Sequence, residues 1–242
     1  MSQPNEPNIT FEKEISHEHN IVKVRYFKDK HPIKSYAFDT SLGKQCAGLQ
    51  LIIKDLEIVL ATLKLTLTLP LMEPSTNPNI DYFQFTTSNP DQLILTSLIN
   101  SSIITYAKYF TQGKGLAPFI NSEKIKSELS SDAYILHEKI IDLRHNFIAH
   151  GGVNDFELAK TVILIDLTHS HSLTYVHHVH HSVMPLVNNI EAFIDLTESF
   201  LRIIKSMLQK RSKALWETEI NKIPIGLHIS KAGDHVTFSN KS

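Results

Sequence analysis

Hydrophobic residues recur at every third or fourth position in four long stretches of the chain, which is the pattern of helices with one apolar face. This pattern predicts helices over about residues 41–63, 90–112, 132–150 and 182–213. Long helices of this kind bury their apolar faces by packing against one another in antiparallel order. The expected fold class is therefore mainly α, an antiparallel helical bundle with small β-hairpin additions.

The residues at the expected helix ends agree with these boundaries. Asn89 can cap the second helix, Pro90 suits its first position and Asp91 favours its positive end. The glycine pair at 151–152 is a typical end for the third helix. The fourth helix ends in basic residues that suit its negative terminus, and a solvated helix end explains them: Lys205, Lys210, Arg211 and Lys213.

Alternating patterns predict the β structure. Residues 20–27 (NIVKVRYF) are strand-like, and KLTLTLP predicts a strand that begins near Lys64. The segments KTVILIDL and LTYVHHVH flank the turn-like THSHS and predict a hairpin. The first ~15 residues are polar and expected to be frayed. Residues 222–238 are expected to add a short hairpin around KAGD.

These elements predict three regions. Residues 1–40 form an N-terminal extension that is partly strand-like. Residues 41–219 form the helical domain, with the β-hairpin inserted near residues 160–181. Residues 220–242 form a C-terminal tail.

The composition is that of a folded protein, since 42% of the 242 residues are hydrophobic and 20% are charged. The formal net charge of −1 gives no overall attraction to a polyanion, so contact with nucleic acid requires a local patch. A single cysteine, Cys46, favours a reducing compartment and suits a small core position. The first residues lack an apolar signal segment, and charges interrupt the apolar run at 49–71. We therefore expect a cytoplasmic protein with no membrane contact.

The stretch RHNFIAHGG, residues 144–152, brings an arginine and two histidines to the end of the third expected helix. RNA cleavage requires one group that takes the proton of the ribose 2′-hydroxyl and one that protonates the leaving 5′-oxygen. Histidine titrates near neutral pH and serves in either role, while arginine binds phosphate through paired hydrogen bonds. Arg144 and His150 thus supply the groups for this reaction, and we expect no metal and no cofactor.

The spacing of these residues is less favourable. On an ideal helix, Arg144 and His150 lie about 120° apart around the axis and about 9 Å apart along it. Asp142, Asn146 and His150 share a face, at steps of four. Arg144 reaches a phosphate held by His150 only if the helix end is distorted, or if a second copy in a two-fold dimer completes the site.

The helix end offers two interpretations of His150. The negative end of the helix dipole favours the protonated imidazole, which suits a general acid. A histidine that caps carbonyl groups and has no chemical role is the simpler interpretation of the same residue.

Six histidines lie within the expected hairpin: His169, His171, His177, His178, His180 and His181. In a regular strand, His178 and His180 share one face, while His177 and His181 share the other. Two histidines spaced by two can chelate a transition metal, but no cysteine or well-placed carboxylate joins them. We therefore favour a solvated hairpin, or a dimer surface that loosens at acidic pH, over a metal site.

The segment LRHNFIAHGG resembles the signature helix of HEPN domains (higher eukaryotes and prokaryotes nucleotide-binding). In that pattern an arginine is followed four to six residues later by a histidine, often with alanine before the histidine. Arg144, Ala149 and His150 match, and His145 stands where asparagine or aspartate is commoner.

A second segment, ITYAKYFTQGKG at residues 104–115, resembles the preceding helix of prokaryotic HEPN-like families. Tyr106 and Phe110 match its Tyr-x-Arg-x-Phe-like element, and Lys108 stands where arginine is usual. The resemblance covers residues 41–213 loosely and residues 104–152 with some specificity.

The resemblance implies a dimeric HEPN-like bundle. Many members of the family look like metal-independent endoribonucleases in toxin–antitoxin, phage-defence or CRISPR-linked systems. Arg144 would then orient and neutralise the scissile phosphate, His150 would transfer a proton and His145 would shape the site. The implied partners are a second copy of the chain, RNA and an antitoxin-like protein. The expected binding residues are Asn146, Tyr106 and Lys108.

Many HEPN domains are inactive, so the alternative is a catalytically silent helical module that dimerises and contacts a nucleotide, RNA or protein. The near-neutral charge of the chain favours this alternative. The sequence contains no phosphate-binding loop, no serine-hydrolase elbow and no HExxH motif, so other enzyme classes have little support.

Overall fold

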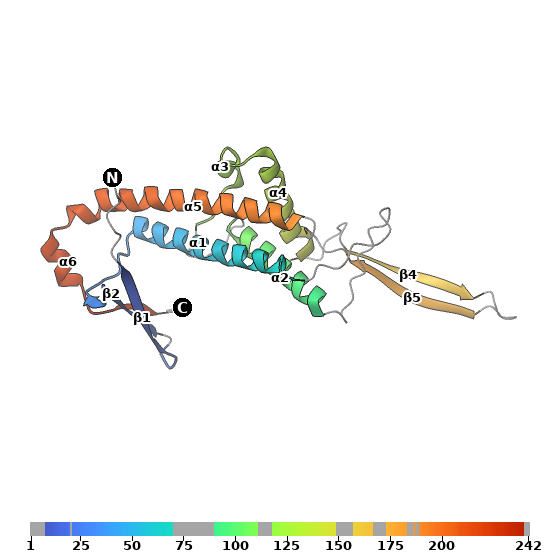
Figure 1. Cartoon of the computed structure of the whole chain (residues 1–242), viewed down its shortest axis with the longest axis horizontal. Helices are drawn as coiled ribbons and strands as arrows, with labels where there is room; N and C mark the ends of the chain where they lie inside the picture. Colours follow the sequence, from blue (N-terminus) through green and yellow to red (C-terminus); the bar gives the residue numbers. More distant parts are fainter. Residues whose placement is uncertain are drawn as a thin grey trace. The chain divides into compact units, whose positions relative to one another are not determined.

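The structure, a computed structural model, describes residues 8–19, 21–69, 90–110, 118–148, 157–166, 173–182, 186 and 189–239. The protein is mainly helical, with a small antiparallel sheet and a separate two-stranded hairpin (Figure 1). The chain divides into two compact units. The sheet unit comprises Met1–Cys46 and Gln209–Ser242, and the helical unit comprises Ala47–Leu208.

The elements follow the predicted order, with several corrections. The helices are α1 (Ser41–Thr66), α2 (Pro90–Ala107), α3 (Ser122–Lys126), α4 (Ser131–Asp142), α5 (Ile190–Thr218) and α6 (Ile225–Lys231). The shorter helical segments are 3-10 turns at Lys108–Phe110 and Ile220–Lys222 and a π-helical segment at Leu143–Ile148. The strands are β1 (Ile9–Ser16), β2 (Ile21–Lys28), β3 (His31–Ile33), β4 (Glu157–Asp166), β5 (Leu173–Ser182) and β6 (Val236–Ser239).

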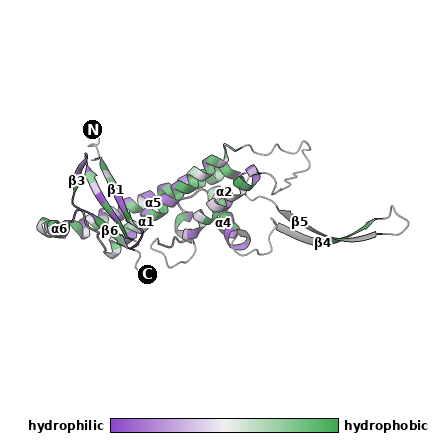
Figure 2. Ribbon diagram, turned by 90° about the horizontal axis from the view of Figure 1, so that it is seen from below, coloured by the Kyte–Doolittle hydropathy of each residue, from purple (hydrophilic) through white to green (hydrophobic). Residues whose placement is uncertain are grey.

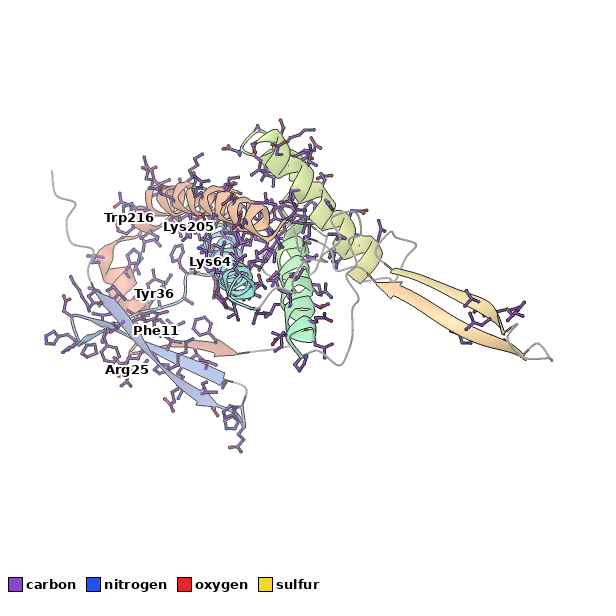
Figure 3. All side chains as sticks on the ribbon, turned by 45° about the vertical axis from the view of Figure 1, so that its right-hand side comes forward. Phe11, Arg25, Tyr36, Lys64, Lys205 and Trp216 are labelled. Carbon is purple, nitrogen blue, oxygen red and sulfur yellow. The ribbon has the colours of Figure 1, made fainter. Side chains whose placement is uncertain are left out.

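In the helical unit, α1 and α5 lie side by side and run in opposite directions (Figure 1). Two exposed ion pairs show this direction, since Lys64 contacts Glu198 at 2.9 Å while Lys205 contacts Glu57 at 3.1 Å. Figure 3 labels both lysines. Exposed pairs of this kind contribute little free energy, so the apolar contacts beneath them hold the helices together.

The core of the helical unit is formed by the apolar faces of α1, α2, α4 and α5. Its buried positions recur every three or four residues, as the sequence pattern predicts. Aromatic rings occupy its centre, where Tyr106 lies 5.4 Å from Phe193 and 5.6 Å from Phe200 between ring centroids. The largest fully buried side chains are Ile52, Leu56, Leu63, Ile99, Ile103, Tyr106, Ile140, Leu143, Phe193, Leu196, Phe200 and Ile204.

The strand predicted to begin near Lys64 is wrong, because α1 continues to Thr66. Leu63 and Thr66 are both buried, at helical spacing. The hydroxyl of Thr66 donates to the carbonyl of Leu63 at 2.5 Å, so threonine side chains satisfy the end of this helix. Leu65 and Leu67, which produce the alternating pattern in the sequence, are both exposed and do not form the buried face of a strand.

The boundaries of the other two long helices also differ from the prediction. The fourth helix was predicted from residue 182, but Ser182 is the last residue of β5 and pairs with Glu157, so α5 begins only at Ile190. It then runs past the predicted end at residue 213 to Thr218. The third predicted helix is α-helical only to Asp142.

The sheet unit pairs the two ends of the chain. β2 is central, with β1 on one side and β3 and β6 on the other. The predicted strand at 20–27 is confirmed, but the expected frayed N-terminus is wrong from Ile9 onward because β1 pairs with β2 along its whole length. The predicted tail hairpin is also wrong, because the tail forms α6 and then β6, which pairs with β2.

Hydrophobic and hydrophilic residues alternate along the strands of the four-stranded sheet (Figure 2), so one face is mainly apolar and the other mainly polar. Phe11 pairs with Tyr26, while Glu12 pairs with Arg25 on the opposite face. The turn between β2 and β3 is tight, since Asp29 and Lys30 both have positive φ values of 51° and 68°. A two-residue hairpin turn requires this conformation, which is more commonly supplied by Asn-Gly.

Candidate functional site

The segment that carries the predicted site follows α4 without a break. Ser130 caps α4 by accepting a hydrogen bond from the backbone of Ala133 at 3.2 Å. After Asp142 the helix widens into the π-helical segment Leu143–Ile148. π-Helical turns are rare and occur frequently at functional sites. Because each hydrogen bond now spans five residues, the angle of about 120° derived for an ideal α-helix does not apply here.

This turn brings Arg144 and His145 into contact. The guanidinium Nη1 of Arg144 lies 3.4 Å from Nδ1 of His145, and both residues are half-buried. Arginine has no acceptor, so it donates and Nδ1 accepts. The proton of a neutral His145 imidazole then lies on Nε2. Arg144 and His145 therefore both present N–H donors, which is the chemistry that binds an anion.

Asn146 lies one residue further along and is exposed. Its side-chain amide donates to the carboxylate of Asp142 at 2.5 Å. This contact confirms that Asp142 and Asn146 share a face. It also places an exposed carboxylate two residues before Arg144, where its negative charge opposes the approach of an anion.

His150, together with Ala149 and the glycine pair, lies outside the described residues. The distance between His150 and Arg144 therefore stays a prediction. The described segment ends at Ile148 and places Arg144 on a π-helical turn, which is one of the two arrangements by which Arg144 was expected to reach a phosphate held by His150; the other is a second copy of the chain.

Tyr106 does not lie at a ligand-accessible surface. It is 0% exposed, packs against Phe193 and Phe200, and contacts Nδ1 of His137 through its hydroxyl at 3.0 Å. Burial raises the pKa of this phenol, so it stays protonated. Tyr106, predicted as a binding residue, thus has a side chain that belongs to the core.

His137 is a buried polar group that the sequence analysis missed. It is 0% exposed, and its Nε2 lies 3.1 Å from the hydroxyl of Ser122. Burial lowers its pKa to about 4, so the imidazole is neutral near pH 7. The available signal was its position on the apolar stripe of α4, four residues after Ala133 and three before Ile140.

Lys108 forms an ion pair with a carboxylate of the same chain. Its amine forms an ion pair with the carboxylate of Asp55, and Tyr109 donates to the same carboxylate at 2.5 Å. Burial raises the pKa of Asp55. The hydrogen bonds from Lys108 and Tyr109, together with the charges of Lys108 and Lys54, outweigh burial and lower the pKa overall. Lys108, predicted as a binding residue, thus joins the turn after α2 to α1.

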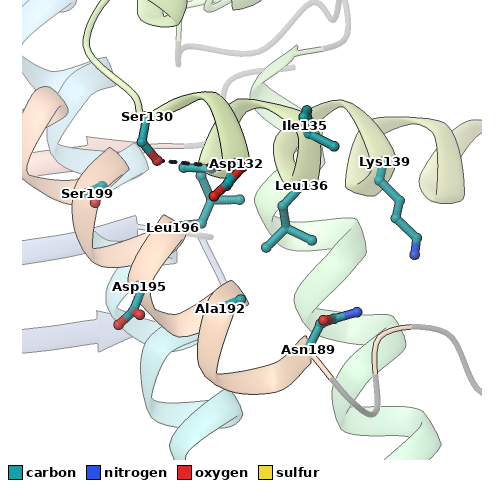
Figure 4. A pocket seen from close by; sticks show the side chains of 11 residues that line it. Ser130, Asp132, Ile135, Leu136, Lys139, Asn189, Ala192, Asp195, Leu196 and Ser199 are labelled. Carbon is teal, nitrogen blue, oxygen red and sulfur yellow. Dashed lines mark hydrogen bonds between the residues drawn. The ribbon is translucent and has the colours of Figure 1, made fainter.

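A separate cavity of about 510 Å³ lies between α4 and the start of α5 (Figure 4). Apolar side chains and two carboxylates, Asp132 and Asp195, line it together with Lys139. No histidine is among the described residues that form it. Its carboxylates repel phosphate, so we do not place the predicted RNA chemistry here. The lining residues are Ser130, Asp132, Ala133, Ile135, Leu136, Lys139, Asn189, Ala192, Asp195, Leu196 and Ser199.

Two further observations concern metals and membranes. Across the described part of the chain, no group of three or more His, Cys, Asp or Glu residues is arranged to hold a metal ion. The side chains of His177, His180 and His181 lie outside the described ones. In the same described ranges, no helix combines the length and hydrophobicity that crossing a bilayer requires.

Comparison of the chain with protein-family models, with curated proteins and with solved structures found no match.

Proposed function

We propose that the protein is a HEPN-like endoribonuclease that cleaves RNA without a metal, in a toxin or phage-defence context. The observation that carries this proposal is the contact of 3.4 Å between Arg144 and His145 on a distorted helix end. Both side chains present donors from half-buried positions, which suits one phosphate group better than a neutral ligand.

In the proposed reaction, the ribose 2′-oxygen attacks the adjacent phosphorus and the bond from phosphorus to the 5′-oxygen breaks. Arg144 neutralises the phosphate, and the Nε2–H of His145 donates to one of its oxygens. His150 protonates the leaving 5′-oxygen, and the proton of the 2′-hydroxyl passes to a second base or to water. The products are a 2′,3′-cyclic phosphate and a free 5′-hydroxyl.

A second copy of the chain is part of this proposal. The segment supplies Arg144, His145 as a donor and His150 as the acid, whereas the reaction also needs a base for the proton of the 2′-hydroxyl. Two such segments related by a two-fold axis would supply the missing group. An antitoxin-like protein is the partner that would mask the site.

The alternative is a catalytically silent helical binding module, which one observation favours. Several lysines of the helical unit are paired with carboxylates of the same unit, so their charges are neutralised rather than offered to RNA. The pairs are Lys54–Asp55, Lys64–Glu198, Lys108–Asp55 and Lys205–Glu57.

Cleavage of an end-labelled single-stranded RNA in the presence of a chelator separates the two functions. We expect the wild type to cleave and to leave cyclic phosphate ends, and Arg144→Ala and His150→Ala each to reduce the rate by about 100-fold or more. His235→Ala, which removes an exposed histidine of the sheet unit, is the matched control and should cleave like the wild type. Equal rates for the wild type and His150→Ala would exclude the enzyme and leave the binding module.

A further inference from the structure

β4 carries an uncharged run with charges of opposite sign at its two ends. The run is Thr161–Val162–Ile163–Leu164–Ile165, preceded by Lys160 and followed by Asp166. All seven residues lie within β4 and pair with β5 in regular antiparallel register.

Three of the four apolar side chains of this run are exposed, and Val162 is half-buried. Ile163 is 65% exposed, Ile165 60% and Leu164 48%, and Val176 opposite Ile163 on β5 is 65% exposed. Ile163 and Ile165 lie on one face of the hairpin and Leu164 on the other, so both faces are apolar. A two-stranded ribbon of this kind is only marginally stable in water without another strand or layer.

The outer edge of β4 can accept another strand. In the part of the chain that the structure describes, β4 and β5 form a two-stranded sheet, so one edge of each is unpaired. Native edges are usually protected by a charge or a proline within the strand. The charged residues of β4 are Glu157, Lys160 and Asp166, and the run 161–165 between the last two contains neither a charge nor a proline.

We propose that this edge binds β4 of a second copy of the chain, forming a four-stranded antiparallel sheet in the order β5–β4–β4–β5. The seven residues are self-complementary. With Ile163 opposite Ile163 on the two-fold axis, Lys160 of each copy lies opposite Asp166 of the other, and Val162 lies opposite Leu164. A slip by one residue would bring unlike faces together, and a slip by two would place Lys160 opposite Leu164.

β5 is the poorer edge for self-pairing. Four of its ten residues are histidine, namely His177, His178, His180 and His181. Pairing two such strands would bring histidines together, and no acidic residue of β5 would offset their charge when they are protonated. The charge pattern therefore selects β4, and a second copy of this chain is the partner that matches it.

Disulfide trapping of the full chain tests this register. In a Cys46→Ser background, Ile163→Cys would place two thiols opposite each other, with Cα atoms about 4.5–5.5 Å apart, within disulfide range. Ile165→Cys is the matched control, because its two copies would be four residues out of register, about 13 Å apart. Under mild oxidation we expect the first variant to form a covalent dimer and the second to stay largely uncrosslinked.

Charge reversal provides an independent test with the same readout. In the Ile163→Cys background, Lys160→Asp would place like charges opposite each other twice, and we expect crosslinking to fall by about tenfold. Adding Asp166→Lys restores opposite charges and should restore crosslinking. Equal crosslinking at 163 and 165, no crosslinking at 163, or no recovery in the double reversal would each overturn the proposal. The readout is independent of RNA cleavage and of dimerisation through the helices, so failure here leaves the proposed function untouched.

Discussion

The hydroxyl of Tyr106 lies 3.0 Å from Nδ1 of His137, and this contact joins α2 to α4 inside the core. The second ring nitrogen of His137 lies 3.1 Å from Ser122, at the start of α3. A neutral imidazole has one donor and one acceptor nitrogen, so both hydroxyls can be satisfied at once. These two contacts of His137 therefore hold α4 in place, and α4 leads directly into the segment that contains Arg144.

The first prediction concerns the pH dependence of stability. The pKa of His137 is lowered from 6.5 to about 4 by burial, so the unfolded chain binds a proton more readily than the folded chain. The stability that depends on the neutral imidazole is fully present above pH 6.5 and is lost as the pH falls toward 4. We expect the free energy of unfolding in urea to drop by about 3 kcal/mol over this range.

His137→Gln is the control for this prediction. Glutamine keeps a donor and an acceptor but does not titrate. Its unfolding free energy should be lower at pH 7 but should change less between pH 6.5 and pH 4 than that of the wild type. An identical pH slope in the two proteins would show that another group carries the effect.

The second prediction compares a buried carboxylate with an exposed one. Asp55 accepts hydrogen bonds from Lys108 and Tyr109, whereas Glu57 forms an exposed pair with Lys205. We expect Asp55→Asn to lower the free energy of unfolding at pH 7 by about 1–3 kcal/mol and Glu57→Gln by less than about 1 kcal/mol. Chemical denaturation of both variants gives the comparison, and equal losses would contradict it.

The third prediction concerns the aromatic centre of the core. Phe200 is 0% exposed and lies 5.0 Å from Phe110 and 5.6 Å from Tyr106 between ring centroids. Phe200→Ala should cost about 3–5 kcal/mol, because it removes the ring and leaves a cavity. Phe200→Leu should cost clearly less. Thermal unfolding of both variants measures the difference. A loss for Phe200→Ala that is as small as the loss for Phe200→Leu would contradict the prediction and mean that the core collapses around the smaller side chain.

The fourth prediction rests on the proposed function and concerns Arg144. The affinity for single-stranded RNA falls as salt rises, and Arg144→Ala should make the slope of log affinity against log salt less steep by about 0.7, the value for one phosphate contact. Arg144→Lys keeps the charge and should keep the slope, but it loses the planar paired donors and should cleave more slowly. Fluorescence anisotropy over a salt series measures the slope. An unchanged slope in Arg144→Ala would place the phosphate elsewhere.

Much of the fold could be predicted from the sequence because the signals are local. Recurrence of apolar residues at three and four positions predicted α1, α2 and much of α4 and α5. Alternation on either side of THSHS predicted the β4–β5 hairpin, and the pattern at 20–27 predicted β2. Alternation failed at residues 64–69, where threonine and leucine repeat with period two over the end of α1 and the turn that follows it.

The candidate site was predicted only in part. The sequence identified Arg144 and His145, and the structure brings them into contact. It also suggested Tyr106 and Lys108 as binding residues. The structure instead places Tyr106 in the core and pairs Lys108 with Asp55, a residue 53 positions earlier. No pattern within one helix could indicate that pairing, because it depends on how two helices meet.

The amino-acid sequence by itself determined the four long helical stretches, where the β4–β5 hairpin forms and which helix end carries the arginine, because these depend on interactions between residues a few positions apart. Only the tertiary structure decided that β6 pairs with β2, that His137 is buried beside Tyr106 and that α4 widens at Leu143. Strand pairing over long sequence separations and the burial of a polar side chain depend on contacts that form only when distant segments pack together.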